Sequence, residues 1–176
     1  MTPSRALWMI ALLLVVSGCA MGPRPGQGDK APSFTAALDT GDKVTLESLM
    51  GEKGMILYFY PKDETPGCIK QACGFRDKLI DFNKKGYDVV GVSQDTPESH
   101  KAFRLAHNLP FRLISDPERT IATLYNVPMA TDPNGTVGFQ RTTFVLSKDG
   151  VIRRRFEVED PSQQVILAAE AIEQPF

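Results

Sequence analysis

The stretch that decides the fold is MILYFYPKDETPGC, residues 55–68. Its first six residues, Met55 to Tyr60, are apolar or aromatic, as in a buried strand. Proline and glycine then break the strand and open a loop that ends at Cys68. Beyond the loop the apolar residues change period and recur every three or four positions from Ala72 to Phe82, as on one face of a helix. The stretch therefore predicts a strand, a loop and a helix in succession.

Cys68 falls on the first turn of the predicted helix. Backbone N–H groups on that turn have no partner within the helix, and the helix dipole favours an anion there. A thiol in this position ionises more readily than a free thiol and becomes a better nucleophile.

A second cysteine, Cys73, follows five residues later. Along a helix that separation is a rise of about 7.5 Å and a turn of about 140°, whereas a disulfide needs Cα atoms within about 7 Å of each other. The two sulfurs could bond only if the first turns of the helix unwound. Such a pair suits sequential chemistry, in which Cys68 is oxidised to a sulfenic acid and Cys73 then attacks it. On these residues alone, two packing cysteines or a fixed disulfide are as well supported.

The block PKDETPGC resembles the catalytic signature of the peroxiredoxins, P-x-x-x-[T/S]-x-x-C, at Pro61, Thr65 and Cys68. The partner cysteine five residues on resembles the bacterioferritin-comigratory, or PrxQ, subclass. The resemblance runs from Asp29 to the C-terminus and implies a thioredoxin-like α/β fold with a central mixed sheet flanked by helices. Further segments that carry it are GVS at 91–93, Asp95, SH at 99–100, LISD at 113–116 and RTTF at 141–144.

The resemblance implies a role for each site residue, with Cys68 as peroxidatic nucleophile and Cys73 as resolving thiol. The Thr65 hydroxyl can hydrogen-bond the thiol and the peroxide, although a turn or helix-cap role fits its spacing equally well. Pro61 would shield the thiolate from water, or simply end the strand. Arg141 would stabilise the thiolate and align the peroxide. From the residues alone, Arg141 would be a solvated surface arginine.

This chemistry needs no metal, flavin or haem, so we expect no cofactor. The thiolate attacks one peroxide oxygen, and water or an alcohol departs. The two histidines, His100 and His107, lie on a predicted helix from Thr96 to Asn108, and a Cys/His metal site would require tighter clusters of ligands. We interpret both as ordinary helix residues.

The N-terminus predicts an exported protein anchored to a membrane, on the periplasmic or another extracytoplasmic face. Arg5 precedes an apolar run from Ala6 to Val16, shorter than the roughly 20 residues that span a bilayer. VSGC at 16–19 resembles a bacterial lipobox, with cleavage before Cys19 and acylation of that cysteine. An uncleaved anchor, or cleavage a few residues later, is the alternative. We expect a signal peptide at 1–18, a flexible tether rich in glycine and proline at 19–30, and one domain at 31–176.

The rest of the chain alternates predicted strands and helices, as an α/β fold requires. Short extended elements or strands are predicted at 44–50, 55–60, 87–93, 111–115, 142–147 and 151–157, the last two as a hairpin. Helices are predicted at 68–85, 96–108, 118–125 and 162–172. Residues 128–140 form a turn-rich loop that departs from the longer, more aromatic and basic insert of the family.

Charge and cysteine content limit the partners. Arg5 is the one charged residue in 1–18, so the mature chain would have 19 basic and 21 acidic residues, a balance that argues against nucleic acid. We expect peroxides as substrates, a thioredoxin-like dithiol protein as reductant, and a monomer, because both redox cysteines lie in one chain. A disulfide oxidoreductase would require Cys-x-x-Cys, which the cysteine spacing does not provide. A non-enzymatic lipoprotein with a redox-sensing or structural cysteine pair is the other alternative.

Overall fold

The stretch 55–68 folds as a strand, a loop and the start of a helix in a computed structural model that describes residues 24–131 and 133–174. Strand β3 (Gly54–Phe59) has all six residues buried. Helix α1 (Pro66–Lys84) begins two residues earlier than its periodicity predicts, because proline favours the first helical position. Cys68 therefore lies on the first turn, as predicted.

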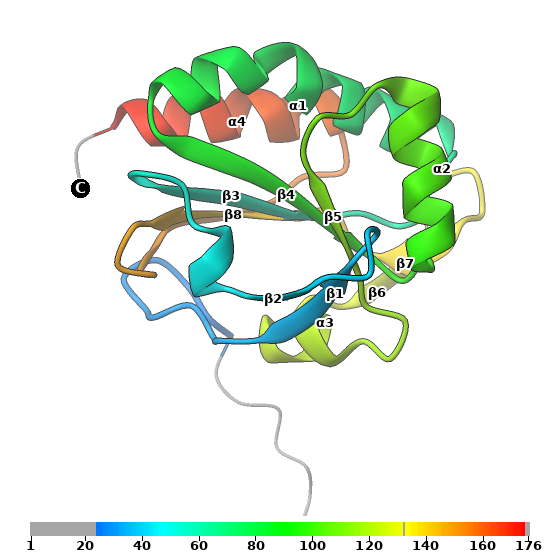
Figure 1. Cartoon of the computed structure of the whole chain (residues 1–176), viewed down its shortest axis with the longest axis horizontal. Coiled ribbons are helices and arrows are strands. Elements are labelled where there is room, and N and C mark those ends of the chain that lie inside the picture. Colours follow the sequence, from blue (N-terminus) through cyan, green and yellow to red (C-terminus); the bar gives the residue numbers. More distant parts are fainter. Residues whose placement is uncertain (1–23, 132, 175–176) are drawn as a thin grey trace, which may run out of the picture.

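Strand β3 lies inside a seven-stranded mixed sheet with the order β2-β1-β5-β4-β3-β8-β9 (Figure 1). It pairs in parallel with β4 (Tyr87–Ser93) and antiparallel with β8 (Thr142–Ser147). The remaining strands of this sheet are β1 (Thr35–Leu38), β2 (Lys43–Thr45), β5 (Arg112–Ser115) and β9 (Ile152–Glu157). The central mixed sheet flanked by helices confirms the predicted fold class.

Helices cover both faces of the sheet, which explains the unbroken apolar run of β3. Helix α4 (Pro161–Glu173) lies beside α1, and α2 (Pro97–His107) covers the same face farther along (Figure 1). The short helix α3 (Thr120–Leu124) and the 3₁₀ turn η1 (Glu47–Leu49) lie on the other face. Alternate residues of β3 point into two separate hydrophobic clusters, with Tyr58 on the α1 side and Phe59 on the α3 side.

Three short elements differ from the sequence expectation. Residues 128–140, expected as a loop, contain the two-stranded sheet of β6 (Met129–Thr131) and β7 (Val137–Phe139). Strand β1, of sequence TAAL, carries two alanines and was not predicted, since alanine has low strand propensity. Helix α3 has only five residues, fewer than the eight predicted, and the Asp116 carboxylate accepts from its Ile121 and Ala122 amides.

Residues 28–30, at the end of the segment expected as a flexible tether, pair with the start of β9 in the structure. The Gly28 amide donates to Ile152 O (2.8 Å), and the Ile152 amide donates to Asp29 O (2.9 Å). Strand β9 is at the edge of the sheet, where its backbone groups need partners, and the N-terminal segment supplies them. Cys19 and the predicted signal peptide lie outside the described residues. In the described part of the chain, no helix has the length and apolarity needed to cross a bilayer.

Candidate active site

Cys68 is buried on the first turn of α1 beside a buried arginine. Cys68 is only 1% exposed, and Arg141 is only 3% exposed. Arg141 directly precedes β8, and its Nη1 and Nη2 atoms each lie 3.5 Å from Cys68 Sγ. A guanidinium that presents two donors to one sulfur favours the thiolate and can also hold a second electronegative group. The alternative of a solvated surface arginine is therefore wrong.

The residue before Cys68 leaves room for this contact. A Cβ atom added to Gly67 would lie 2.6 Å from Arg141 Nη2, closer than van der Waals contact allows. Glycine at position 67 thus lets the guanidinium approach the first turn of α1.

Two buried glutamines hold Arg141, and sequence reasoning identified neither. Gln71 Oε1 accepts a hydrogen bond from Arg141 Nη1 (2.7 Å), and Gln71 is three residues after Cys68, on the same helix face. Gln164 of α4 donates from Nε2 to the Arg141 carbonyl (3.1 Å) and accepts from the Thr143 hydroxyl. The spacing of Gln71 from Cys68 was a usable signal, whereas nothing in the sequence places Gln164 near residue 141.

Thr65 and Pro61 lie in the loop that leads to Cys68. Thr65 is the N-cap residue of α1, but its hydroxyl donates to Lys62 O (3.1 Å) and closes the turn before the helix. Its turn role is therefore present in the structure, and a contact with peroxide stays a prediction. Pro61 is buried, and its backbone packs against β7, where a Cβ atom at Gly138 would come within 2.2 Å of Pro61 O. The β6–β7 hairpin thus forms one wall of the loop.

Cys73 lies on the next turns of α1 and is half-buried. Both cysteines are free thiols on one continuous helix. Below them, the ring of Tyr58 stacks on Phe75 with centroids 4.6 Å apart. Burial raises the pKa of the Tyr58 hydroxyl well above its usual value, and the nearby Cys68 raises it further.

The two histidines lie on α2 as predicted, but His100 is not an ordinary helix residue. It is completely buried and contacts Asp63 in the loop before α1. His107 Nε2 lies 3.0 Å from Glu64 Oε2, in the same loop. Among the described residues, no group of three or more His, Cys, Asp or Glu side chains is placed to hold a metal ion.

Comparison with known proteins places this site in a family. Residues 27–155 match the AhpC/TSA family. Over 127 residues the chain is 46% identical to the peroxiredoxin bcp of Coxiella burnetii, covering 71% of this chain and 83% of that protein. It is also 46% identical over 127 residues to the chloroplastic peroxiredoxin Q of Populus jackii, covering 72% of this chain and 58% of that longer protein.

Solved structures agree with the sequence relatives. Peroxidoxin BcpB from Mycobacterium tuberculosis superposes with a TM-score of 0.77 at 27% identity, covering 85% of this chain and 97% of that chain. Peroxiredoxin Q of Xanthomonas campestris gives a TM-score of 0.70 at 28% identity, covering 80% and 90%. The fold is thus thioredoxin-like, as in these peroxidases. The chain belongs to the AhpC/TSA family, and within it to the peroxiredoxins of the bacterioferritin-comigratory, or PrxQ, type.

Proposed function

We propose that the chain reduces hydrogen peroxide and organic hydroperoxides through a Cys68 sulfenic acid and a Cys68–Cys73 disulfide. The observation that carries the proposal is the pair of Arg141 nitrogens, each 3.5 Å from the buried Cys68 sulfur. The thiolate attacks one peroxide oxygen, so that an S–O bond forms and the O–O bond breaks. The departing oxygen takes a proton and leaves as water or an alcohol. The Arg141 donors lie where they can stabilise the thiolate and the developing charge on oxygen.

The second step joins the two cysteines. The Cys73 thiolate attacks the Cys68 sulfur, so that an S–S bond forms and the S–O bond breaks, releasing hydroxide that takes up a proton. Helix α1 is continuous from Pro66 to Lys84, and five residues of helix rise about 7.5 Å. The first turns of α1 must therefore unfold before the disulfide can form.

Organic hydroperoxides are proposed as substrates by analogy with a relative. The structure of the bacterioferritin comigratory protein of Xanthomonas campestris, 28% identical with a TM-score of 0.69, was described with its alkyl peroxide reduction activity.

We further propose that a thioredoxin-like dithiol protein returns two electrons to the disulfide, and that the enzyme acts as a monomer. An extracytoplasmic location would make this reductant essential, because that environment keeps dithiols oxidised.

The membrane anchor is proposed on Cys19. Residues 20–23 are the four positions between Cys19 and Arg24, where the described chain begins. Fully extended, the five Cα steps span at most about 18 Å. Since residues 24–30 lie along β9, an acylated Cys19 would hold the β9 edge of the domain close to the bilayer. Mass spectrometry of the mature N-terminal peptide tests this, and recovery of Cys19→Ser in the membrane fraction like wild type would contradict it.

Oxidation of Cys68 by peroxide tests the peroxidase proposal. Trp8, the one tryptophan of the chain, falls in the predicted signal peptide, so quenched-flow mass spectrometry is a better probe than intrinsic fluorescence. We expect Cys73→Ser to accumulate a sulfenic acid on Cys68 at the wild-type rate, because the first step needs only Cys68. We expect Cys68→Ser to lose peroxide reduction altogether. Peroxide reduction by Cys68→Ser at the wild-type rate would exclude the mechanism.

A further inference from the structure

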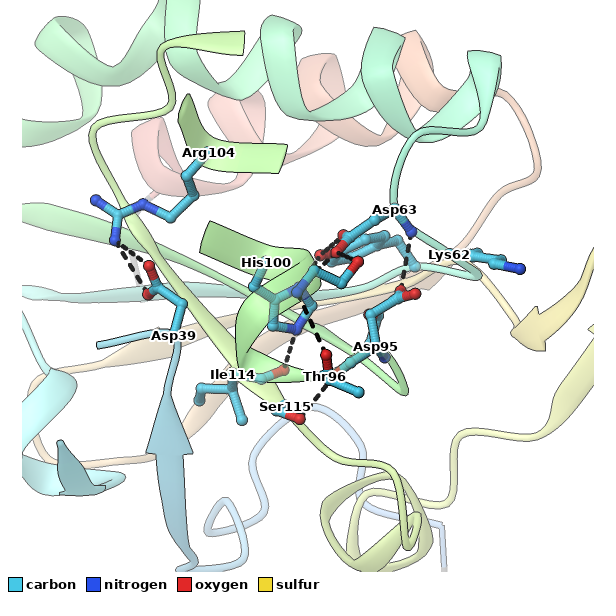
Figure 2. Close-up of polar contacts among 12 residues, drawn as sticks. Asp39, Lys62, Asp63, Asp95, Thr96, His100, Arg104, Ile114 and Ser115 are labelled. Atoms are coloured by element: carbon cyan, nitrogen blue, oxygen red, sulfur yellow. Dashed lines mark hydrogen bonds and ion pairs between the residues drawn. The ribbon is translucent and has the colours of Figure 1, made fainter. Parts of the chain in front are cut away.

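A cluster of buried polar side chains lies beneath the loop that precedes α1 (Figure 2). Its centre is the contact between Asp63 Oδ2 and His100 Nδ1, at 2.9 Å. Asp63 is 4% exposed and His100 is completely buried. Figure 2 shows His100 reaching from α2 to the region between Asp63 and Ile114. The peroxide reaction described above uses neither side chain directly.

The hydrogen bonds fix how the cluster is assembled. His100 Nε2 lies 3.1 Å from Ile114 O, and a carbonyl can only accept, so Nε2 carries a proton. On the other side of the ring, Nδ1 and Asp63 Oδ2 share one proton, whether they are written as imidazolium and carboxylate or as their neutral forms. Tyr60 donates to Asp63 Oδ1 (2.7 Å), and Ser99 donates to Oδ2 (2.8 Å). Burial and Asp63 both raise the pKa of Tyr60, so its hydroxyl remains a donor.

The cluster holds the turn at Pro61 from both ends. Tyr60 precedes Pro61, and Asp63 follows it two residues later, so both flanking side chains meet at one carboxylate. The Asp63 amide also donates to Asp95 Oδ2 (2.9 Å), which fixes the main chain at the same point. The turn then continues to Thr65, whose hydroxyl donates to Lys62 O. Displacing Asp63 would therefore displace the loop that carries Pro61 and Thr65.

We infer that His100 is a positioning residue for the peroxide reaction, acting through Asp63 on the loop before Cys68. The inference rests on the proposed peroxidase role of Cys68. Arg141 reaches Cys68 from β8, not from this loop, so its contact with the sulfur does not depend on His100. Loss of His100 should disturb the walls that orient a peroxide more than it disturbs the thiolate itself.

Because peroxide alignment and thiolate reactivity depend on different contacts, two rates measured on Cys68 can distinguish loss of positioning from loss of stability. Iodoacetamide alkylates a thiolate without needing an aligned O–O bond. In His100→Leu we expect the rate constant for oxidation of Cys68 by peroxide to fall about tenfold to a hundredfold, the range typical of a small misplacement. The rate of alkylation by iodoacetamide should change less than about threefold, because the Arg141 donors to Cys68 stay in place.

The same helix offers a matched control. Arg104, one turn after His100 on α2, donates to both carboxylate oxygens of the buried Asp39 at 2.7 and 3.0 Å. Figure 2 shows this pair on the side of the cluster away from Lys62 and Asp63. Asp39→Asn also weakens a buried charged contact of α2 but leaves the loop before Cys68 in place. We expect it to keep both the peroxide and the iodoacetamide rate.

A second pair of variants separates positioning from stability. Asp63→Asn keeps the shape of the side chain and can donate to a neutral His100, so it should lower the peroxide rate less than His100→Leu does. Added to His100→Leu, the same change replaces a buried carboxyl group that has lost its imidazole partner with a neutral amide, and it should recover thermal stability. It should not recover the peroxide rate, because the anchor of the loop is still broken.

The outcomes are distinct. The inference is overturned if His100→Leu keeps both wild-type rates, or if it loses the peroxide rate and the iodoacetamide rate equally. It is also overturned if the double variant recovers the peroxide rate together with its stability. If His100→Leu does not fold, His100→Phe takes its place, because its ring fills the space of the imidazole but can donate to neither Asp63 nor Ile114 O. If wild-type Cys68 itself reacts with peroxide no faster than a free thiol, the proposed function fails instead, and the wild-type measurement alone shows it.

Discussion

Cys68 and Cys73 share one helix but lie in unlike surroundings. Cys68 is 1% exposed and faces two nitrogens of Arg141. Cys73 is half-buried on a later turn of α1. Gly67 before the first cysteine makes room for a guanidinium, whereas Gly74 after the second lies against Val165 of α4.

This contrast indicates which parts of the molecule control each step of the proposed cycle. The surroundings of Cys68 are built by tertiary contacts from β8, α4 and the loop before α1. The position of Cys73 is set mainly by the helix that it must leave. Changes near Cys68 should therefore act on the reaction with peroxide, and changes near Cys73 on formation of the disulfide.

The largest effect that would test the contrast is expected from Arg141→Met. Methionine keeps an unbranched apolar stem but removes both donors to Cys68, and Gln71 loses its buried partner. We expect the second-order rate constant with peroxide to fall about 10²- to 10³-fold, as when one preorganised donor to a developing charge is removed. Stopped-flow competition with a reference peroxidase measures it.

Arg112→Met is the matched control for that change. Arg112 pairs with Asp88 at 2.9 Å, and both side chains are at least a third exposed, so its loss should leave the peroxide rate within twofold, in line with the small energies of surface pairs. A peroxide rate in Arg141→Met equal to that of Arg112→Met would remove the basis of the contrast.

A smaller effect is expected from Gly67→Ala. The new methyl group would meet Arg141 Nη2 at 2.6 Å, so the guanidinium must move away from the sulfur. We expect the peroxide rate to fall roughly tenfold, about the effect of losing part of one charged hydrogen bond. The measurement is the same rate constant as for Arg141→Met.

Gly74→Ala provides the comparison within the helix. Its Cβ would lie 3.0 Å from Val165 Cγ2 and touch nothing at Cys68. The rate of Cys68 oxidation should stay within about twofold of wild type, because the new methyl group meets Val165 of α4 and not Arg141. Equal slowing in the two glycine variants would mean that general disturbance of α1, not the Arg141 contact, limits the reaction.

The sequence predicted the parts of this site that depend on local order along the chain. Cys68 falls on a first helical turn because a buried strand, a proline–glycine loop and a helical period follow one another within residues 55–82. The five-residue spacing to Cys73 is likewise a local property. Arg141 could be assigned only through the family resemblance, because it lies 73 residues from Cys68 and β8 brings it back beside β3.

The parts that escaped prediction depend on contacts between distant segments. His100 looked like any polar residue on an amphipathic helix, and only the packing of α2 over the loop before α1 buries it against Asp63. The segment 24–30 has the composition of a flexible linker, but the open edge of β9 binds it. Neither outcome follows from residue type or hydrophobic periodicity, since both depend on where the contacting segment lies in the fold.

The smallest expected effect concerns Tyr58, which lies beneath both cysteines. Its hydroxyl is buried and has no hydrogen-bond partner among the described residues. Tyr58→Phe should stabilise the fold by about 1 kcal/mol at neutral pH, because it removes an unsatisfied polar group and keeps the stacking on Phe75. Burial raises the folded-state pKa of this hydroxyl above its unfolded value. Above pH ~10 the unfolded chain of the wild type releases a proton that the folded chain retains, so stability falls as pH rises.

Tyr58→Phe has no such proton to lose, so its advantage over wild type in urea unfolding should grow from pH 9 to pH 11, on either side of the ordinary tyrosine pKa of about 10. Both cysteine steps should keep their wild-type rates, because the contrast between Cys68 and Cys73 comes from Arg141 and the loop, not from the ring that both share. A tenfold loss of the peroxide rate in Tyr58→Phe, a change of about 1.4 kcal/mol in the barrier, would instead make the hydroxyl a third donor at the site.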